Sequence, residues 1–256
     1  MGDVDVLRGC AREAYAVLLD NIPAFTRRAA VPFVLLLPIQ LIDYMRQESG
    51  FSDPLGIALG LGLLALACHT SFMVSWHRFV LLGPRASDTG IRFGRRELRF
   101  LVTSLAPLAL AGVLLLPLGI AIYPLHAGGT VSDGVIGPAF TIIFVGLLVW
   151  SFSRFLPAFP SLAVDRALGL RHAWRMTKSH QGTIVLIVLC ALSPAMLMEA
   201  LLAALAGAML DVLGVAVLVL ATAIGFVGDA VGIGAASLIY ARLAPAALAE
   251  PFAESG

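Results

Sequence analysis

Six long apolar stretches follow one another along this chain, and they restrict its folding more than any other feature of the sequence. A helix needs about 20 consecutive apolar residues to cross the hydrocarbon core of a bilayer. The stretches cover roughly residues 29–45, 55–78, 100–123, 135–157, 182–206 and 212–241. Only 13% of the residues are charged, about half the share that a soluble domain carries. The sequence therefore predicts an all-α, polytopic membrane bundle of six transmembrane helices.

Basic residues mark alternate connections between these stretches. Sixteen of the seventeen Lys and Arg residues flank one set of helix ends, and only Arg46 lies on the other side. Cytoplasmic segments collect Lys and Arg, so we expect both termini in the cytoplasm. No signal peptide is expected, because the N-terminus lacks a basic-then-apolar order. Arginine outnumbers lysine sixteen to one, as in GC-rich genomes, so we expect a multi-pass protein of a bacterial cytoplasmic (inner) membrane.

The regions outside the membrane are expected to be short. Residues 1–28 would form a cytoplasmic interfacial segment, residues 29–243 the transmembrane domain, and residues 244–256 a cytoplasmic tail. An amphipathic helix is expected over 3–26, lying on the cytoplasmic surface and turning at Asn21-Ile22-Pro23. Its apolar positions at helical spacing are Leu7, Cys10, Ala14, Val17 and Leu18, with Arg8, Arg12 and Glu13 facing elsewhere.

A second basic segment covers residues 166–181. Arg171, Arg175 and Lys178 are spaced i, i+4 and i+7, so a helix would place them on one face. Trp174 would lie beside them, and an indole suits the headgroup region of a bilayer. Such a cationic face is a candidate phosphate site. The alternative is an ordinary surface helix whose cations only set the topology.

The even-numbered stretches end alike, with an aromatic residue, one intervening residue and an arginine. The three endings are Trp76-His77-Arg78, Phe152-Ser153-Arg154 and Tyr240-Ala241-Arg242. This pattern predicts three repeated helical hairpins. One interpretation is that Arg78, Arg154 and Arg242 share one lipid phosphate or a partner's carboxylates, which arginine holds bidentately. The other is an aromatic belt with snorkelling arginines.

Ionisable residues also occur inside the stretches, where they are costly and usually face the bundle interior. They are His69, Glu199 and Asp229. Gly228 and Gly232, beside Asp229, form a small-xxx-small pair that lets another helix approach closely. Asp229 and His69 could meet in a polar cavity for proton coupling or a headgroup. Alternatively, a neutral Asp229 only locks helices together, and Glu199 is simply hydrated near the outer leaflet.

Residues 150–182 carry a recognisable pattern of an arginine, a Leu-Pro-Ala step, an acidic residue near a glycine turn, and Ala-Trp-x-x-Thr-Lys. Its residues are Arg154, Leu156-Pro157-Ala158, Asp165, Gly169, Ala173, Trp174, Thr177 and Lys178. The pattern resembles the glycerophosphoryl diester phosphodiesterase membrane-domain superfamily of uncharacterised six-span bacterial proteins. Some members carry a phosphodiesterase domain after the spans. This sequence ends about 13 residues after the expected membrane domain, so we do not expect that activity here.

No chemistry-bearing motif stands out. Cys10, Cys68 and Cys190 have no metal-ligand spacing and suggest no disulfide framework, and no hydrolase or zinc-protease motif is present. We therefore expect no enzyme activity, no cofactor, no metal and no nucleic-acid partner. The expected role is to bind anionic lipid of the cytoplasmic leaflet, to act as a scaffold subunit for a membrane protein partner, or both. The alternative is a transporter or lipid translocase that uses a midplane polar site around Asp229 and His69.

Overall fold

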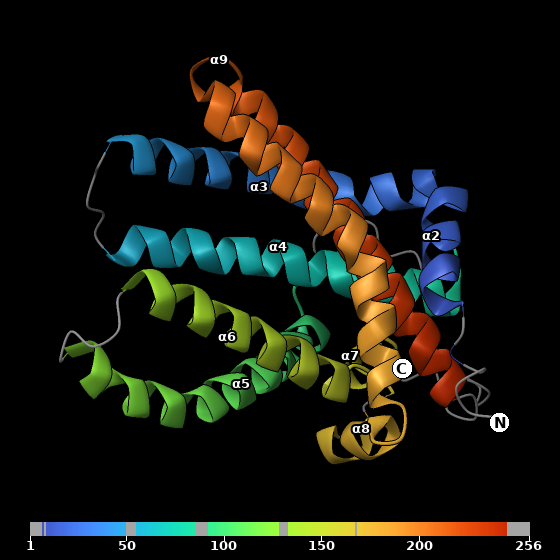
Figure 1. Cartoon of the computed structure of the whole chain (residues 1–256). Helices are drawn as coiled ribbons and strands as arrows, with labels where there is room; N and C mark the ends of the chain where they lie inside the picture. Colours follow the sequence, from blue (N-terminus) through green and yellow to red (C-terminus); the bar gives the residue numbers. More distant parts are fainter. Residues whose placement is uncertain are drawn as a thin grey trace.

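The computed structural model describes residues 7, 9–49, 55–84, 92–127, 133–166 and 168–244, and within these ranges the regular structure is entirely helical. The helices are α2 (Cys10–Asp20), α3 (Ile22–Ser49), α4 (Leu55–Leu82), α5 (Arg95–Ala127), α6 (Asp133–Phe155), α7 (Ala158–Ala163), α8 (Leu170–Thr177) and α9 (Gln181–Leu243) (Figure 1). The predicted all-α fold is confirmed. The expected tail lies outside the described residues beyond Ala244.

Among the described residues, six segments are long and apolar enough to cross a membrane, which confirms a multi-pass membrane protein. They are Ile22–Ile42, Leu59–Leu82, Arg95–Tyr123, Gly137–Phe155, Gln181–Leu202 and Gly214–Leu243. The first begins before the predicted position 29, because α3 continues through Arg27 and Arg28. Arg28 is only 4% exposed; its guanidinium lies 4.5 Å from the ring centroid of Phe79 and donates to the Ala24 carbonyl at 3.0 Å.

α9 supplies the last two spans by folding back on itself between Leu202 and Gly214 (Figure 1). The two arms lie so close that a Cβ atom on Gly228 would come within 2.8 Å of the Ala195 Cβ. A Cβ on Gly232 would come within 2.9 Å of the Leu192 side chain. The close approach expected from this glycine pair is therefore present, and it lies between the fifth and sixth spans.

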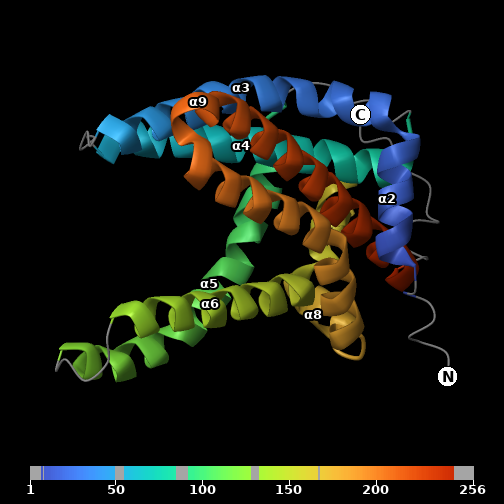
Figure 2. The ribbon, with the colours of Figure 1, turned by 45° about the horizontal axis from the view of Figure 1, so that its top comes forward.

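The helices form two parts that meet at one end of the bundle. α3, α4 and α9 pack with α2 around the larger apolar core. α5 and α6 form a separate antiparallel pair, which diverges from the rest along most of its length (Figure 2). A smaller cluster of Val74, Phe100, Phe159 and Ala163 joins α4, α5 and α7 at the base of that pair. The predicted pairing into three hairpins is thus seen in α3–α4, α5–α6 and the two arms of α9.

The N-terminal amphipathic helix ends earlier than predicted and packs on protein. α2 ends at Asp20 and α3 begins at Ile22. The prediction of one helix over 3–26 was therefore wrong, whereas the predicted turn at Asn21 is present. Residues 1–6 and 8 lie outside the described part of the chain. The face of α2 formed by Cys10, Ala14 and Leu18 is buried. It packs against α9, where a Cβ on Gly234 would lie 3.3 Å from the Ala14 Cβ.

The glycine contact between the arms of α9 can be tested with single methyl groups. We expect Gly228→Ala to lower the free energy of unfolding by about 1–3 kcal/mol, because the added Cβ meets the fixed Cβ of Ala195. Gly146→Ala is the matched control, since nothing lies within 4 Å of its added Cβ. Thermal unfolding in detergent, followed by circular dichroism, measures both. Equal melting temperatures for the two variants would contradict the close contact.

Candidate functional site

The basic residues that end the spans gather at the end of the bundle where α2, α7 and α8 lie, and we name this the basic end (Figure 1). Arg78 lies four residues before the end of α4, and Arg154 and Arg242 lie in the last turns of α6 and α9. Antiparallel packing of successive helices brings these three helix ends to the same side. Within this end, however, the three arginines have different partners.

Arg242 binds α2. Its Nη2 lies 2.5 Å from both carboxylate oxygens of Glu13, and its Nη1 donates to the Cys10 sulfur at 3.1 Å. The Tyr15 hydroxyl donates to the Ala191 carbonyl at 2.7 Å, so α2 is tied to both arms of α9. Arg242 thus serves the docking of α2, and its charge is already matched by a carboxylate of this chain.

Arg78 binds the segment between α7 and α8. Its Nη1 donates to the Ala163 carbonyl at 3.0 Å and lies 3.3 Å from an Asp165 oxygen. The contacts of Arg78 and Arg242 are therefore with different acidic residues on different elements. They give no support to one phosphate shared by all three arginines.

Arg154 lies with the predicted residues of the second basic segment. Its guanidinium carbon is 5.0 Å from the ring centroid of Trp174 and 5.8 Å from that of Trp150. Aromatic faces attract a guanidinium by about 0.5–2 kcal/mol. The Nε and Nη1 atoms of Arg154 are buried and have no hydrogen-bond acceptor among the described residues. This side chain is therefore a donor group held at a fixed position beside α8.

α8 presents its cations because its opposite face is fixed to α6. Ala173 and Thr177 are buried, and the Thr177 hydroxyl donates to the Arg154 carbonyl at 3.0 Å. Just after α8, Gln181 at the start of α9 donates from Nε2 to the Trp150 carbonyl of α6 at 3.2 Å. Arg171, Arg175 and Lys178 remain on the exposed face, although Lys178 follows the last residue of α8.

A groove of about 580 Å³ lies along this face. It is lined by Phe155, Leu170, Arg171, Trp174 and Arg175. The lining is almost entirely apolar, and two arginine side chains contribute to it beside the ring of Trp174. Of the seven basic-end residues singled out in the sequence, Arg171, Trp174 and Arg175 line this groove, and Arg154 lies against Trp174.

His69 and Asp229 lie against each other inside the membrane region. His69 Nδ1 is 3.3 Å from Asp229 Oδ2, and the side chains are 38% and 31% exposed. The imidazole also stacks on Phe226, with ring centroids 5.5 Å apart. Glu199 lies elsewhere, facing Gly225 across the two arms of α9, and is exposed.

Sequence reasoning missed a second polar contact along the same side of α9. The Thr222 hydroxyl donates to Gln40 Oε1 at 2.6 Å and so joins α9 to α3. Thr222, Phe226 and Asp229 are spaced i, i+4 and i+7, so they form one face. The only signal in the sequence was Gln40, the single polar residue in the run of residues 29–42.

Comparison with models of protein families, with curated proteins and with solved structures gave no match. The family resemblance of residues 150–182 stays a prediction. No group of three or more His, Cys, Asp or Glu side chains that could hold a metal ion occurs among the described residues.

The docking of α2 can be tested through Cys10. Burial raises the pKa of the Cys10 thiol above its ordinary value, although the neighbouring Arg242 acts in the opposite direction. The thiol therefore stays protonated at neutral pH, and alkylation requires the thiolate. In a Cys68→Ala, Cys190→Ala background, we expect slow maleimide labelling of Cys10. Glu13→Gln should increase the rate of labelling by a factor of up to about five, because loss of the ion pair with Arg242 weakens the docking of α2 by up to ~1 kcal/mol.

Arg12→Gln is the control for that experiment, since Arg12 is exposed on the same helix and belongs to none of these contacts. Mass spectrometry of the alkylated protein gives the labelling rate at pH 7.5. An unchanged rate in Glu13→Gln would show that the ion pair does not hold α2 on α9.

Proposed function

We propose that this protein is a non-enzymatic component of a bacterial inner membrane that binds an anionic phospholipid in the groove beside α8. The observation that carries the proposal is a groove whose lining combines the apolar side chains of Phe155, Leu170 and Trp174 with the side chains of two arginines, Arg171 and Arg175. A phospholipid has the matching arrangement, with a phosphate placed directly above its acyl chains.

The chemistry of each part supports this ligand. Arginine binds phosphate oxygens bidentately, and a tryptophan at a bilayer interface keeps one edge wet and its ring in apolar surroundings. Arg154 adds buried donor atoms next to Trp174. The groove also lies on the arginine-rich side, which we expect to be cytoplasmic, where anionic headgroups attract each nearby cation by about 1 kcal/mol.

A scaffolding role is compatible with the same proposal. The α5–α6 pair exposes apolar side chains along most of its length, including Val113, Leu116 and Ile142. Either lipid tails or a membrane protein partner can cover such a surface. The phosphodiesterase activity of the resembling family is not part of the proposal.

The lipid proposal can be tested by native mass spectrometry of protein gently extracted from its own membrane. We expect the wild type to retain an anionic phospholipid. Arg171→Gln with Arg175→Gln should weaken its binding about 30-fold, because two cations contribute roughly 2 kcal/mol. Arg12→Gln with Arg27→Gln removes the same charge from exposed positions on α2 and α3 and serves as the matched control.

Equal lipid retention by both double variants would overturn the groove as the binding site. Co-purification of a protein, with lipid binding indifferent to Arg171 and Arg175, would favour the scaffold role alone. In that case the cations of α8 only set the orientation of the chain in the membrane.

A second candidate function is a transporter or lipid translocase, which the paired His69 and Asp229 favour. Ionisable groups at such depth often line the path of a substrate or proton.

Lipid translocation can be tested in liposomes that contain dye-labelled phospholipid and are treated with dithionite from outside. If the protein translocates lipid, dithionite bleaches the dye of the inner leaflet as well as that of the outer leaflet. Asp229→Asn should slow that exchange about tenfold, whereas Glu199→Gln should not. Protected inner-leaflet dye in wild-type liposomes would exclude lipid translocation.

A further inference from the structure

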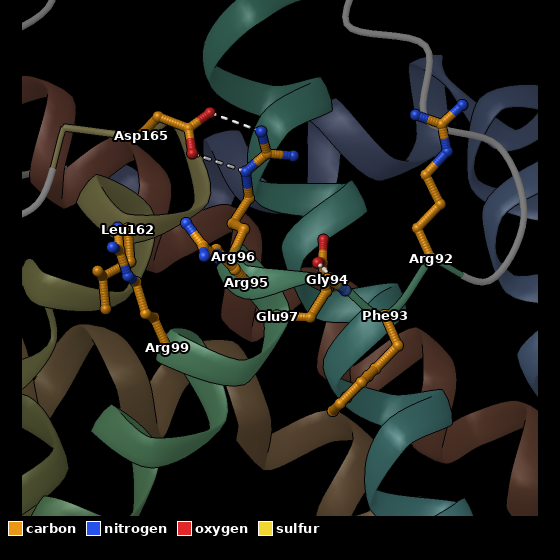
Figure 3. A pocket seen from close by; sticks show the side chains of 9 residues that line it. All are labelled: Arg92, Phe93, Gly94, Arg95, Arg96, Glu97, Arg99, Leu162 and Asp165. Atoms are coloured by element: carbon orange, nitrogen blue, oxygen red, sulfur yellow. Dashed lines mark hydrogen bonds and ion pairs between the residues drawn. The ribbon is translucent and has the colours of Figure 1, made fainter.

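A second basic pocket lies at the start of α5, apart from the α8 groove (Figure 3). Its volume is about 540 Å³. Four arginines and two carboxylates contribute to its lining, among them Arg95, Arg96, Arg99 and Asp165. Unlike the α8 groove, it has no tryptophan and no broad apolar floor, so its chemistry suits a compact anion and not an acyl chain.

One carboxylate already occupies part of this pocket. Asp165 accepts from Arg96 Nε at 2.9 Å and from Arg96 Nη2 at 2.6 Å, through its two oxygens. Arg78 Nη1 lies 3.3 Å from the same carboxylate. A planar pair of oxygens bound in parallel by one guanidinium is also how arginine holds two oxygens of a phosphate. Asp165 therefore marks a position where Arg96 holds an oxyanion.

The backbone of Asp165 is unusual. Its φ angle is +60°, in the left-handed region, where a non-glycine residue costs of order 1 kcal/mol or more. The side chain is nevertheless 56% exposed, so its burial does not explain this conformation. The conformation belongs to the end of α7, where the Arg166 N–H donates to the Ser161 carbonyl at 2.8 Å. It leaves a solvent-accessible carboxylate beside Arg96, where an anion from outside can compete with it.

Two further arginines are available to such an anion. Arg95 and Arg99 are exposed, and neither has a carboxylate partner among the described residues. They are four residues apart on α5, so they lie on one face, where like charges repel. In Figure 3 their side chains lie with Arg96 on the side of the pocket that holds Asp165 and Leu162, while Arg92 stands on the opposite side. An anion there would relieve this repulsion.

The second carboxylate of the pocket, that of Glu97, does not oppose the binding of an anion. Glu97 is only 7% exposed and accepts from the Gly94 backbone N–H at 2.8 Å, which caps the first turn of α5. Its charge is thus directed at the helix N-terminus, where a carboxylate is stabilised.

We propose that this pocket binds a phosphate monoester through Arg95, Arg96 and Arg99, with Asp165 as a built-in competitor for Arg96. When the ligand binds, the Arg96 guanidinium exchanges the Asp165 carboxylate for two phosphate oxygens. Arg78 keeps its hydrogen bond to the Ala163 carbonyl, so α4 stays attached to α7. This site is independent of the α8 groove, and the phosphate can belong to a soluble molecule or to a lipid headgroup.

The test uses the full chain in nanodiscs of phosphatidylcholine, titrated with inorganic phosphate at constant ionic strength by calorimetry. Asp165→Asn removes the competing charge, and asparagine tolerates the left-handed backbone. We expect this variant to bind phosphate about tenfold more tightly than the wild type. Arg95→Gln with Arg99→Gln should weaken binding about tenfold or more.

One control distinguishes this site from the α8 groove, and a second distinguishes soluble phosphate from the phosphate of a lipid headgroup. Arg171→Gln with Arg175→Gln should leave phosphate binding unchanged, even where it abolishes phospholipid retention. Nanodiscs containing phosphatidic acid, analysed by native mass spectrometry, present the phosphate as a headgroup. If Asp165→Asn strengthens the retention of phosphatidic acid but not the binding of inorganic phosphate, the site binds a lipid headgroup.

A purely structural role of Asp165 makes a different prediction. Asp165→Asn would then lower the melting temperature and leave phosphate and phosphatidic acid binding no stronger than in the wild type. That result, or equal affinity in the wild type and the Arg95→Gln, Arg99→Gln variant, would overturn the proposal.

Discussion

Charge is costly in hydrocarbon, and this constraint arranges the whole molecule. The cations of alternate connections meet at the basic end, where they bind the chain's own carboxylates and aromatic rings. Arg242 binds Glu13, Arg78 and Arg96 bind Asp165, and the guanidinium of Arg154 lies over indole rings. These contacts close the bundle at one end, while the opposite ends of α5 and α6 diverge from it (Figure 2).

α9 shows how apolar packing complements that closure. Its two arms approach closely at Gly228 and Gly232, and its second arm binds α4 through Trp76, whose Nε1 donates to the Ala230 carbonyl at 2.8 Å. His77 Nδ1 lies 2.7 Å from Ser237 Oγ, about two turns further along α9. Hydrogen bonds between side chains and neighbouring helices contribute to helix association in membranes, and these two bonds fix the register of α4 against α9. The His69–Asp229 pair continues the same seam.

The spans could be predicted from sequence because hydropathy and arginine spacing are local signals, and the grouping of Arg171, Arg175 and Trp174 followed from helical periodicity. The contact partners could not. Asp165 meets Arg96 across 69 residues and Arg78 across 87, from a turn with no periodic pattern. The apolar face of α2 was predicted correctly, but hydrophobic spacing does not distinguish a lipid surface from α9. The early start of α3 depended on the burial of Arg28, which only tertiary contacts reveal.

The turn that holds Asp165 is itself built by a single serine. Ser161 is fully buried; its carbonyl accepts from the Arg166 N–H at 2.8 Å and its hydroxyl accepts from the Leu168 N–H at 3.1 Å. These bonds close the chain around Asp165 and stabilise its left-handed backbone. The same turn leads directly into α8. Both candidate anion sites therefore depend on the connection between α6 and α9. Its turn supplies Asp165 to the pocket at the start of α5, and α8 supplies Arg171 and Arg175 to the groove.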